Sequence, residues 1–202
     1  MTRHASERME AQLRTWEGLR LRPYRDSGQW AIGYGHKCSL EWWVTYCMTG
    51  DCPINATQAD LWLHTDIVRA QGQVDQVFRA VHMGQTRFDA LVAMMYQLGA
   101  TRFGKFPRMI EAIFLGDWIE AGGECLSGKN PSTQSAWLRE TPARCWHISH
   151  MLSAGEWPEA DEMSARIERT PGADFAGDSD GHVVAMDGGL VGPRGVALRD
   201  EL

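Results

Sequence analysis

The sequence has no long apolar run and no basic surplus. No stretch approaches the ~18 consecutive apolar residues of a membrane-spanning helix. The first fourteen residues, MTRHASERMEAQLR, are charged throughout and lack the apolar segment of a signal peptide. We therefore expect a protein without a membrane span that is made in the cytoplasm and depends on other factors for any export.

The net charge of −6 arises entirely from the C-terminal part of the chain. Residues 1–158 carry 16 Lys and Arg against 16 Asp and Glu, whereas residues 159–202 carry 4 against 10. The body is therefore neutral and the tail is acidic. Nothing in this distribution supports a basic surface for nucleic acid, so no nucleic-acid partner is expected.

Cysteine is scarce, and its count of five is odd, which excludes a complete disulfide framework. Cys38, Cys47 and Cys52 lie close in sequence and could form one disulfide in an oxidising compartment. Structural zinc needs four convergent ligands, so we expect no metal there and no cofactor elsewhere. Cys125 and Cys145 fall in helical patterns and are expected to be buried free thiols.

Helical periodicity dominates the chain up to residue 158. Asn55 is placed as the N-cap of a long helix, and Thr141 followed by Pro142 marks the start of another. Gly99 should end a helix that is apolar almost all round and therefore central. The expected helices are 5–16, 57–82, 86–98, 106–115, 117–126, 132–138 and 142–154.

The segment 17–36 departs from this helical pattern. Gly18 stops the first helix and leaves Glu17 at its end. Strand patterns flank the turn that begins at Asp26, so a small hairpin follows. Two carboxylates at a junction between a helix and a hairpin suggest acid–base chemistry on a polar polymer.

The composition changes after Trp157-Pro158. Residues 159–170 could continue as a polar helix, and residues 171–181 are typical of a linker. The pattern from residue 182 to 198 favours a second hairpin. No internal repeat is visible.

Three motifs, in this order, resemble the phage-type lysozymes, glycoside hydrolase family twenty-four. In the first, eight residues separate a glutamate, Glu17, from an aspartate, Asp26, and the sequence Ile32-Gly33-Tyr34-Gly35-His36 follows. The second runs from Phe88-Asp89-Ala90-Leu91 through Gln97-Leu98-Gly99 to Phe103-Gly104-Lys105-Phe106. The third is Trp137, then Thr141-Pro142-Ala143-Arg144, closing near Gly155-Glu156-Trp157.

This resemblance implies a mostly α-helical α+β fold of the lysozyme type with two lobes. A small β-hairpin lobe (1–56), a long connecting helix (57–82) and a helical C-terminal lobe (83–158) would form the catalytic domain. The acidic extension, 159–202, lies beyond the family's core, and a virion protein is one possible partner for it. The implied substrate is the peptidoglycan glycan strand.

The resemblance also assigns roles to particular residues. Glu17 would be the general acid, since the apolar neighbours of a helix end favour the neutral form of a carboxylic acid. Asp26, in a polar turn, would be the ionised partner. Three residues match supporting positions of the family: Arg144 would pair with Glu17, and His36 with Asp66 would join the hairpin to the long helix. Gln97 and Tyr34 match residues that line the cleft and bind substrate.

Each assignment has a simpler structural interpretation. Asp26 could be only a turn former, Arg144 a surface arginine and Gln97 a satisfied polar group in a core. His36 is expected to be structural rather than catalytic. Trp42, Trp43 and Tyr46 could stack on sugars, although core packing is the favoured interpretation.

One departure from the family pattern concerns water. The family places five residues and then a threonine after the aspartate, and that hydroxyl helps to hold the attacking water. Here the turn is one residue shorter, and Ala31 occupies the position. Ser27 or Gln29 could substitute, Asp26 could act alone, or activity could be reduced.

The expected function is therefore an N-acetylmuramidase, a lysozyme that cleaves the β-1,4 bond between N-acetylmuramic acid and N-acetylglucosamine. The alternatives are a lytic transglycosylase and a non-catalytic glycan-binding or virion structural module. A tailed bacteriophage is the expected source, with the protein acting in the periplasm either as a monomeric endolysin released by a holin or as a virion-borne enzyme.

Overall fold

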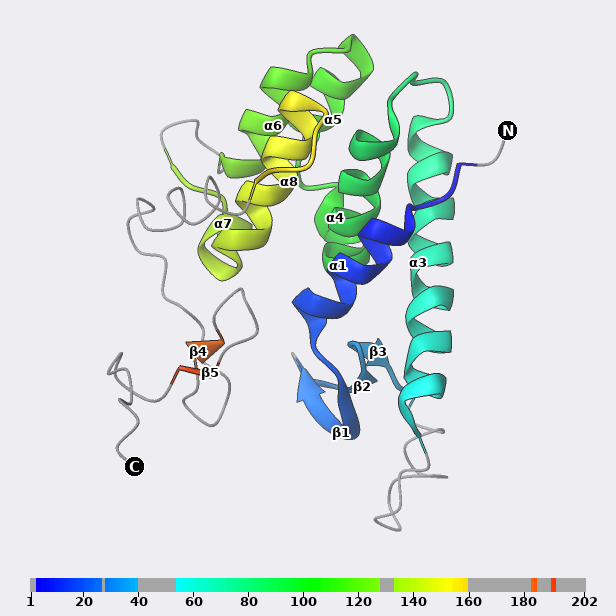
Figure 1. Cartoon of the computed structure of the whole chain (residues 1–202). Helices are drawn as coiled ribbons and strands as arrows, with labels where there is room; N and C mark the ends of the chain where they lie inside the picture. Colours follow the sequence, from blue (N-terminus) through cyan, green and yellow to red (C-terminus); the bar gives the residue numbers. More distant parts are fainter. Residues whose placement is uncertain are drawn as a thin grey trace.

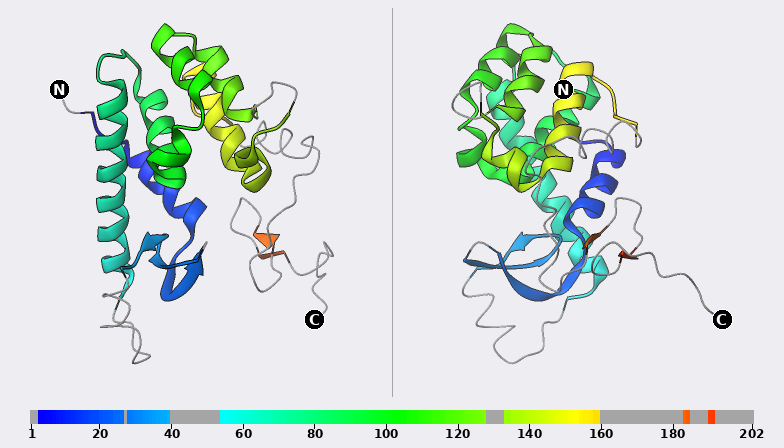
Figure 2. Two further views of the ribbon diagram at one scale, coloured as in Figure 1. Left: turned by 180° about the vertical axis from the view of Figure 1, so that it is seen from behind. Right: turned by 90° about the vertical axis from the view of Figure 1, so that its left-hand side faces the viewer.

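The computed structural model describes residues 3–26, 28–39, 54–127 and 133–159, together with two short strands at 183–184 and 190–191. The chain is mostly helical and carries a small three-stranded antiparallel sheet near its N-terminus, which confirms the predicted α+β class. The sheet lies at one end of the long helix α3 (Ala56–Phe78), and the other helices gather around the opposite part of it (Figures 1 and 2).

Helix α1 (Glu7–Glu17) begins at Ser6, whose hydroxyl accepts a hydrogen bond from the amide of Met9. The fully buried carboxylate of Asp89 accepts bonds from both the amide and the hydroxyl of Ser6, at 2.9 and 2.5 Å. A buried carboxylate needs such donors, because an unpaired charge is costly in the protein interior. Asp89 therefore fixes the start of α1 against the central helix.

The sheet consists of β1 (Arg20–Asp26), β2 (Gln29–Gly33) and β3 (His36–Lys37), in that spatial order. The hairpin predicted around Asp26 is thus present, and His36–Lys37 adds a third strand. Pro23 lies in β1, which is an edge strand, where its missing amide hydrogen breaks no ladder bond.

Helix α3 starts where the sequence predicted, with Asn55 accepting a bond from the amide of Gln58 at 2.9 Å. It ends at Phe78 rather than at residue 82. The sheet packs closely on it, since a Cβ atom built on Gly33 would lie 3.2 Å from the Cβ of Ala59. Helix α3 therefore contacts the sheet at its beginning and the central helix α4 further along.

The remaining helices form the second lobe. Helix α4 (Gln85–Phe103) is interrupted at Gly99, whose φ of 67° and ψ of 164° are not helical, so the predicted break is present but a further turn follows it. The other elements are α5 (Pro107–Leu115), α6 (Trp118–Leu126), α7 (Ala136–Glu140) and α8 (Pro142–Ala154).

One predicted helix of this lobe has the wrong bounds. The helix expected over 132–138 begins only at Ala136, because Ser135 caps it by accepting from the amide of Leu138 at 2.9 Å. Thr141 is the N-cap residue of α8 and Pro142 its first residue, as predicted, but the Thr141 side chain makes no capping bond. Its hydroxyl instead donates to the carbonyl of Trp137 and accepts from Gln97, both at 3.3 Å.

The core lies mainly in the helical lobe and continues along α1 and α3. Its largest fully buried side chains include Trp137, Phe78, Phe88 and Phe103. Cys125 and Cys145 are buried free thiols, as predicted, and burial raises the pKa of both. Cys38 is also a free thiol, whereas Cys47 and Cys52 lie outside the described residues.

Several predictions fall where the structure is not described. The aromatic segment 41–46 and the region 160–182 belong to this part of the chain. In the predicted second hairpin, β4 (Val183–Val184) pairs antiparallel with β5 (Leu190–Val191). None of the helices in the described ranges has both the length and the apolar character needed to cross a membrane.

Candidate active site

Glu17 is the last residue of α1, and its position is set by the way the helix ends. Gly18 adopts a φ of 63° and returns its amide hydrogen to the carbonyl of Arg14 at 3.1 Å. This conformation suits glycine and stops the helix directly after the glutamate. The side chain of Glu17 is 21% exposed and points toward the sheet and α8, so the short sequence Glu17-Gly18 aims a carboxylate between the lobes.

Arg144 holds that carboxylate. It lies in the first turn of α8 and donates from Nη1 to Oε1 of Glu17 at 2.7 Å, across 127 positions of sequence. Its side chain is only 9% exposed, and its Cζ lies 4.9 Å from the centre of the Trp16 ring. A buried guanidinium needs acceptors for its N–H groups, and Glu17 supplies one of them while the Trp16 ring covers the guanidinium. The contact predicted between Arg144 and Glu17 is therefore present.

The second oxygen of Glu17 faces the sheet. A Cβ atom built on Gly35, which has a φ of 84°, would lie 3.5 Å from Oε2 of Glu17 and 3.9 Å from the hydroxyl of Tyr24. Burial, together with the negative charge of Glu17, raises the pKa of Tyr24. Glu17 Oε2 and the Tyr24 hydroxyl therefore both face Gly35, which has no side chain to fill the space near them.

A second tyrosine lies near the same carboxylate. Burial raises the pKa of Tyr96 strongly, with Glu17 and Asp66 adding to the effect. The Tyr96 hydroxyl donates to the carbonyl of Tyr34 at 2.6 Å, which joins α4 to the turn after β2. The Tyr34 ring is only 9% exposed and packs in the core, so its predicted contact with substrate remains a prediction confined to the ring edge and main chain.

Asp26 ends β1 and is much more exposed, at 46% of its side chain. It pairs across the turn with Gln29, and its carboxylate contacts the ammonium group of Lys37 in β3. Ala31, at the position where the family has a threonine, is fully buried in the middle strand. The two predicted catalytic carboxylates are thus in different settings, one enclosed and one open to water.

His36 and Asp66 form the predicted link between sheet and long helix, with 2.7 Å between Nδ1 and Oδ2. The ring of His36 stacks on Trp62 at 4.8 Å between ring centres. Arg69 donates to the other oxygen of Asp66 at 2.7 Å. These contacts orient β3 on α3, which makes the pair structural in this arrangement.

Gln97 is held by two bonds and is half-buried. Its Oε1 accepts from the indole nitrogen of Trp137 at 2.9 Å, and its Nε2 donates to Thr141 at 3.3 Å. It therefore connects α4 to the short segment that precedes α8. Thr141 lies one helical turn before Arg144, so the same contacts also support the arginine that holds Glu17.

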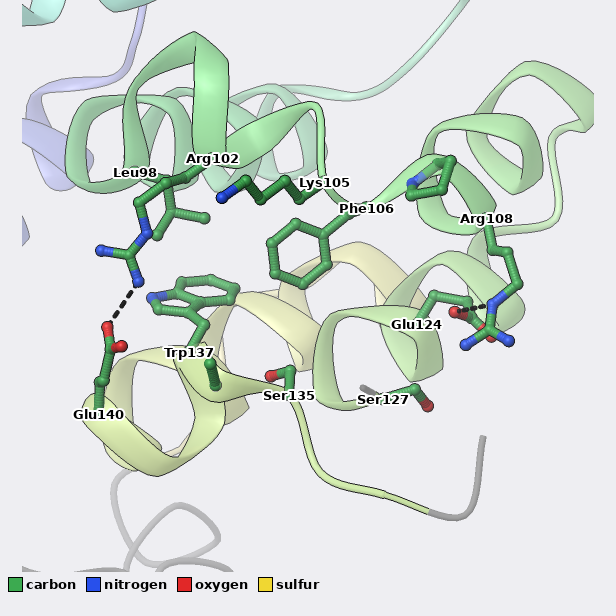
Figure 3. Close-up of a pocket in the computed structure, with 12 residues that line it drawn as sticks. Leu98, Arg102, Lys105, Phe106, Arg108, Glu124, Ser127, Ser135, Trp137 and Glu140 are labelled. Carbon is green, nitrogen blue, oxygen red and sulfur yellow. Dashed lines mark hydrogen bonds and ion pairs between the residues drawn. The ribbon is translucent and has the colours of Figure 1, made fainter. Parts of the chain in front are cut away.

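Two cavities are relevant. A cavity of about 280 Å³ between the lobes is lined by residues that include Gly35, His36, Lys37, Asp66 and Tyr96. A larger one, about 600 Å³, lies within the helical lobe between the end of α4, α5, α6 and α7, with Trp137 and Phe106 forming part of its wall (Figure 3). Neither Glu17 nor Asp26 lines either cavity, but the smaller one is lined by Gly35 and Lys37, which lie next to Glu17 and Asp26 respectively.

Sequence reasoning missed three residues of this site: Tyr24, Tyr96 and Lys37. Nothing in the sequence related any of them to Glu17 or Asp26. Among the described residues, no group of three or more His, Cys, Asp or Glu side chains is arranged to hold a metal ion. The arrangement can supply one enclosed carboxyl group and one solvated carboxylate.

Comparison with protein families gives a match to a family model. The family model for phage lysozyme matches residues 14–129, which is more than half of the chain and includes Glu17, Asp26, His36 and Asp66. No curated protein matches the chain. The family's activity is lysozyme-type hydrolysis of peptidoglycan. The extent of this match, and the helical fold with its small sheet, show that the chain belongs to the phage lysozyme family.

Proposed function

We propose that the chain is an N-acetylmuramidase that cleaves the β-1,4 bond between N-acetylmuramic acid and N-acetylglucosamine. Glu17 would donate the proton to the leaving oxygen, and Asp26 would act as the base or stabilise the oxocarbenium charge. The observation that carries this proposal is the bond of 2.7 Å between Arg144 and Glu17.

Arg144 occupies only one oxygen of Glu17. Oε2 remains to carry the proton toward the cleft, next to Gly35. After transfer Glu17 is an anion, and the guanidinium then faces a full negative charge that was absent before the step. An interaction that strengthens as the reaction proceeds lowers the barrier rather than merely binding the substrate.

Asp26 suits the complementary role because it is solvated. A carboxylate that is 46% exposed stays ionised easily and can be reached by water. Gln97, and Tyr34 through its ring edge or main chain, would contact the glycan from the lobe walls. His36 and Asp66 would keep β3 in place.

We further propose where this activity would take place. A phage origin would place synthesis in the host cytoplasm and action on the periplasmic cell wall, after release by a holin or from the virion. Residues 159–202, with their negative charge, would dock on a virion protein in the second case, and a free endolysin would be a monomer.

The test replaces Glu17 by glutamine, which keeps the shape of the side chain but has no acidic proton. We expect the release of reducing ends from purified peptidoglycan to fall by roughly 10²- to 10⁴-fold, the usual contribution of general acid catalysis. Glu111→Gln, at an exposed position of α5, is the matched control and should behave as the unmodified protein does. Activity that survives in Glu17→Gln would exclude Glu17 as the acid.

A lytic transglycosylase is the second candidate, favoured by the absence of a hydroxyl at Ala31. Such an enzyme needs the acid but no attacking water. Mass spectrometry of the products separates the two, because the transglycosylase leaves anhydro-muramic ends and the muramidase leaves reducing ends. A glycan-binding module would give neither product.

A further inference from the structure

The missing threonine is part of a row of three side chains across the sheet. Ala31 in β2 pairs with Tyr24 of β1 on one side and with Lys37 of β3 on the other. Residues directly opposite in an antiparallel sheet place their side chains on the same face. Tyr24, Ala31 and Lys37 therefore share the face on which Glu17 approaches Tyr24.

Asp26 belongs to the same face, since it follows Tyr24 by two residues along β1. Neighbouring strands lie about 4.8 Å apart, so β1 and β3 are separated by roughly 10 Å with β2 between them. The ammonium group of Lys37 nevertheless contacts the carboxylate of Asp26. The lysine side chain must therefore cross β2 diagonally, from Ala31, which is opposite Lys37, toward Gln29, which is opposite Asp26.

The size of Ala31 matters for this path. Ala31 is fully buried, so other side chains already cover its methyl group, and threonine would add two further atoms, one of them a hydroxyl, in the path of the lysine. Ala31 and Lys37 therefore go together: the small residue permits the long one to reach Asp26.

Lysine can also do what a hydroxyl does for water. Its ammonium group has three donors, of which one engages Asp26 and the others remain available to a water oxygen. Lys37 and Asp26 are each 46% exposed, so water and substrate reach both. A purely structural ion pair with this exposure adds little to stability, which makes its two possible roles separable by experiment.

We propose that Lys37 is a positioning residue that replaces the missing hydroxyl, holding the Asp26 carboxylate and an attacking water on the exposed side of this ion pair. This rests on the proposed function. The water oxygen bonds to the anomeric carbon as the bond to the leaving oxygen breaks. Asp26 takes a proton from that water and Glu17 gives one to the leaving oxygen. Lys37 neither gains nor loses a proton.

The first test is Lys37→Met, which keeps the length of the side chain and removes its donors. We expect kcat to fall roughly 10- to 100-fold, the cost of misplacing a reacting group, while KM and the melting temperature stay close to those of the unmodified enzyme. Lys37→Arg, which retains a cationic donor, should keep most of the activity. Lys105→Met removes the same charge from an exposed position in the helical lobe and should change nothing.

The second test replaces the ammonium group of Lys37 by a hydroxyl group at position 31. Ala31→Thr alone should lower kcat, because the added atoms obstruct Lys37. Ala31→Thr combined with Lys37→Met should be more active than Lys37→Met alone, since a hydroxyl then replaces the ammonium group at the same place. Such a gain is a strong departure from additivity that a merely structural role does not produce.

The outcomes separate this inference from the function on which it rests. A Lys37→Met enzyme that behaves as Lys105→Met does, or a double variant no better than Lys37→Met, overturns the role of Lys37 while Glu17→Gln remains inactive. A fall in kcat matched by a fall in melting temperature also overturns it. Activity in Glu17→Gln overturns the proposed function instead. If Ala31→Thr does not fold, the comparison of Lys37→Met with Lys37→Arg decides.

Discussion

The two carboxylate oxygens of Glu17 have different surroundings. Oε1 receives a charged donor from Arg144, while Oε2 and the neutral hydroxyl of Tyr24 both face Gly35. Glycine at position 35 has two uses, because its φ of 84° is unfavourable for other residues and its missing side chain opens the space in front of Oε2. The carboxylate is therefore fixed on one side and accessible on the other.

Gly35→Ala tests this accessibility. The substitution introduces backbone strain of about 1–2 kcal/mol and places a methyl group in ordinary van der Waals contact with Oε2, at 3.5 Å. We expect a melting temperature lower by a few degrees. At temperatures well below the melting temperature we expect activity reduced roughly tenfold, since the methyl group takes the space through which substrate approaches the proton donor. The measurement is reducing-end release at 25 °C alongside thermal unfolding.

The control for that variant is Gly116→Ala at the end of α5. Gly116 has a φ of 75°, and a Cβ atom built there meets nothing within 4 Å. It should lose similar stability but keep its activity. Equal activity in the two variants would show that Gly35 serves only the backbone.

At the scale of elements, the placement of Arg144 depends on how closely α8 packs on α6. A Cβ atom built on Gly122 of α6 would lie 2.6 Å from the carbonyl oxygen of Ser149 and 2.9 Å from the Cβ of Ser153, both on α8. The Ser149 hydroxyl donates to the carbonyl of Gly122 at 2.8 Å. The two backbones are thus in contact without an intervening side chain.

Gly122→Ala should therefore be strongly destabilising. A methyl group at that distance from a main-chain oxygen forces α6 and α8 apart, and overpacking of this kind costs about 1–3 kcal/mol. Gly123→Ala, one residue on and with nothing within 4 Å, should instead stabilise the helix by up to ~1 kcal/mol. Urea unfolding of both variants measures the difference, and equal stabilities would contradict the close packing.

The elements themselves were largely predictable, and the exceptions share a cause. The helix caps at Asn55 and the stop at Gly18 depend on residues adjacent in sequence, so local rules located them. Thr141 is the N-cap residue of α8 as these rules predicted, but its hydroxyl makes no capping bond, because Gln97 and the Trp137 carbonyl engage it instead. Tertiary partners thus override a local preference when they offer comparable bonds.

At the scale of the whole domain, aromatic side chains connect its N-terminal helix to its C-terminal end. The His147 ring lies edge-to-face between Trp16 of α1, at 5.1 Å, and Trp157, at 5.6 Å. Arg8 lies over Trp157 at 4.5 Å, and the buried Nε2 of His147 has no hydrogen-bond partner among the described residues. Burial, with the charges of His150 and Arg8, lowers the pKa of His147 to about 4.

This lowered pKa makes stability depend on pH. Since the folded pKa is below the unfolded value of 6.5, the unfolded chain binds a proton first as the pH falls. The contribution of His147 is complete above pH 6.5 and is lost as the pH falls toward 4, by on the order of 3 kcal/mol. Urea unfolding between pH 7.5 and 4.5 should show the decline, and His147→Leu should reduce its slope. An unchanged slope would mean that His147 does not stay neutral in the folded protein.

The sequence by itself determined the features that depend on neighbours along the chain and on ordered motifs. These are the helices and the hairpin, the Glu17–Asp26 spacing, and the membership of the lysozyme family. The family resemblance also implied the pairing of Arg144 with Glu17, which the structure contains. Only the tertiary structure decided other contacts between distant residues: Lys37 with Asp26 across an intervening strand, and Gly122 of α6 with Ser149 of α8. Local propensity arises from a few adjacent residues, whereas these contacts depend on strand register and helix packing, which many residues set together.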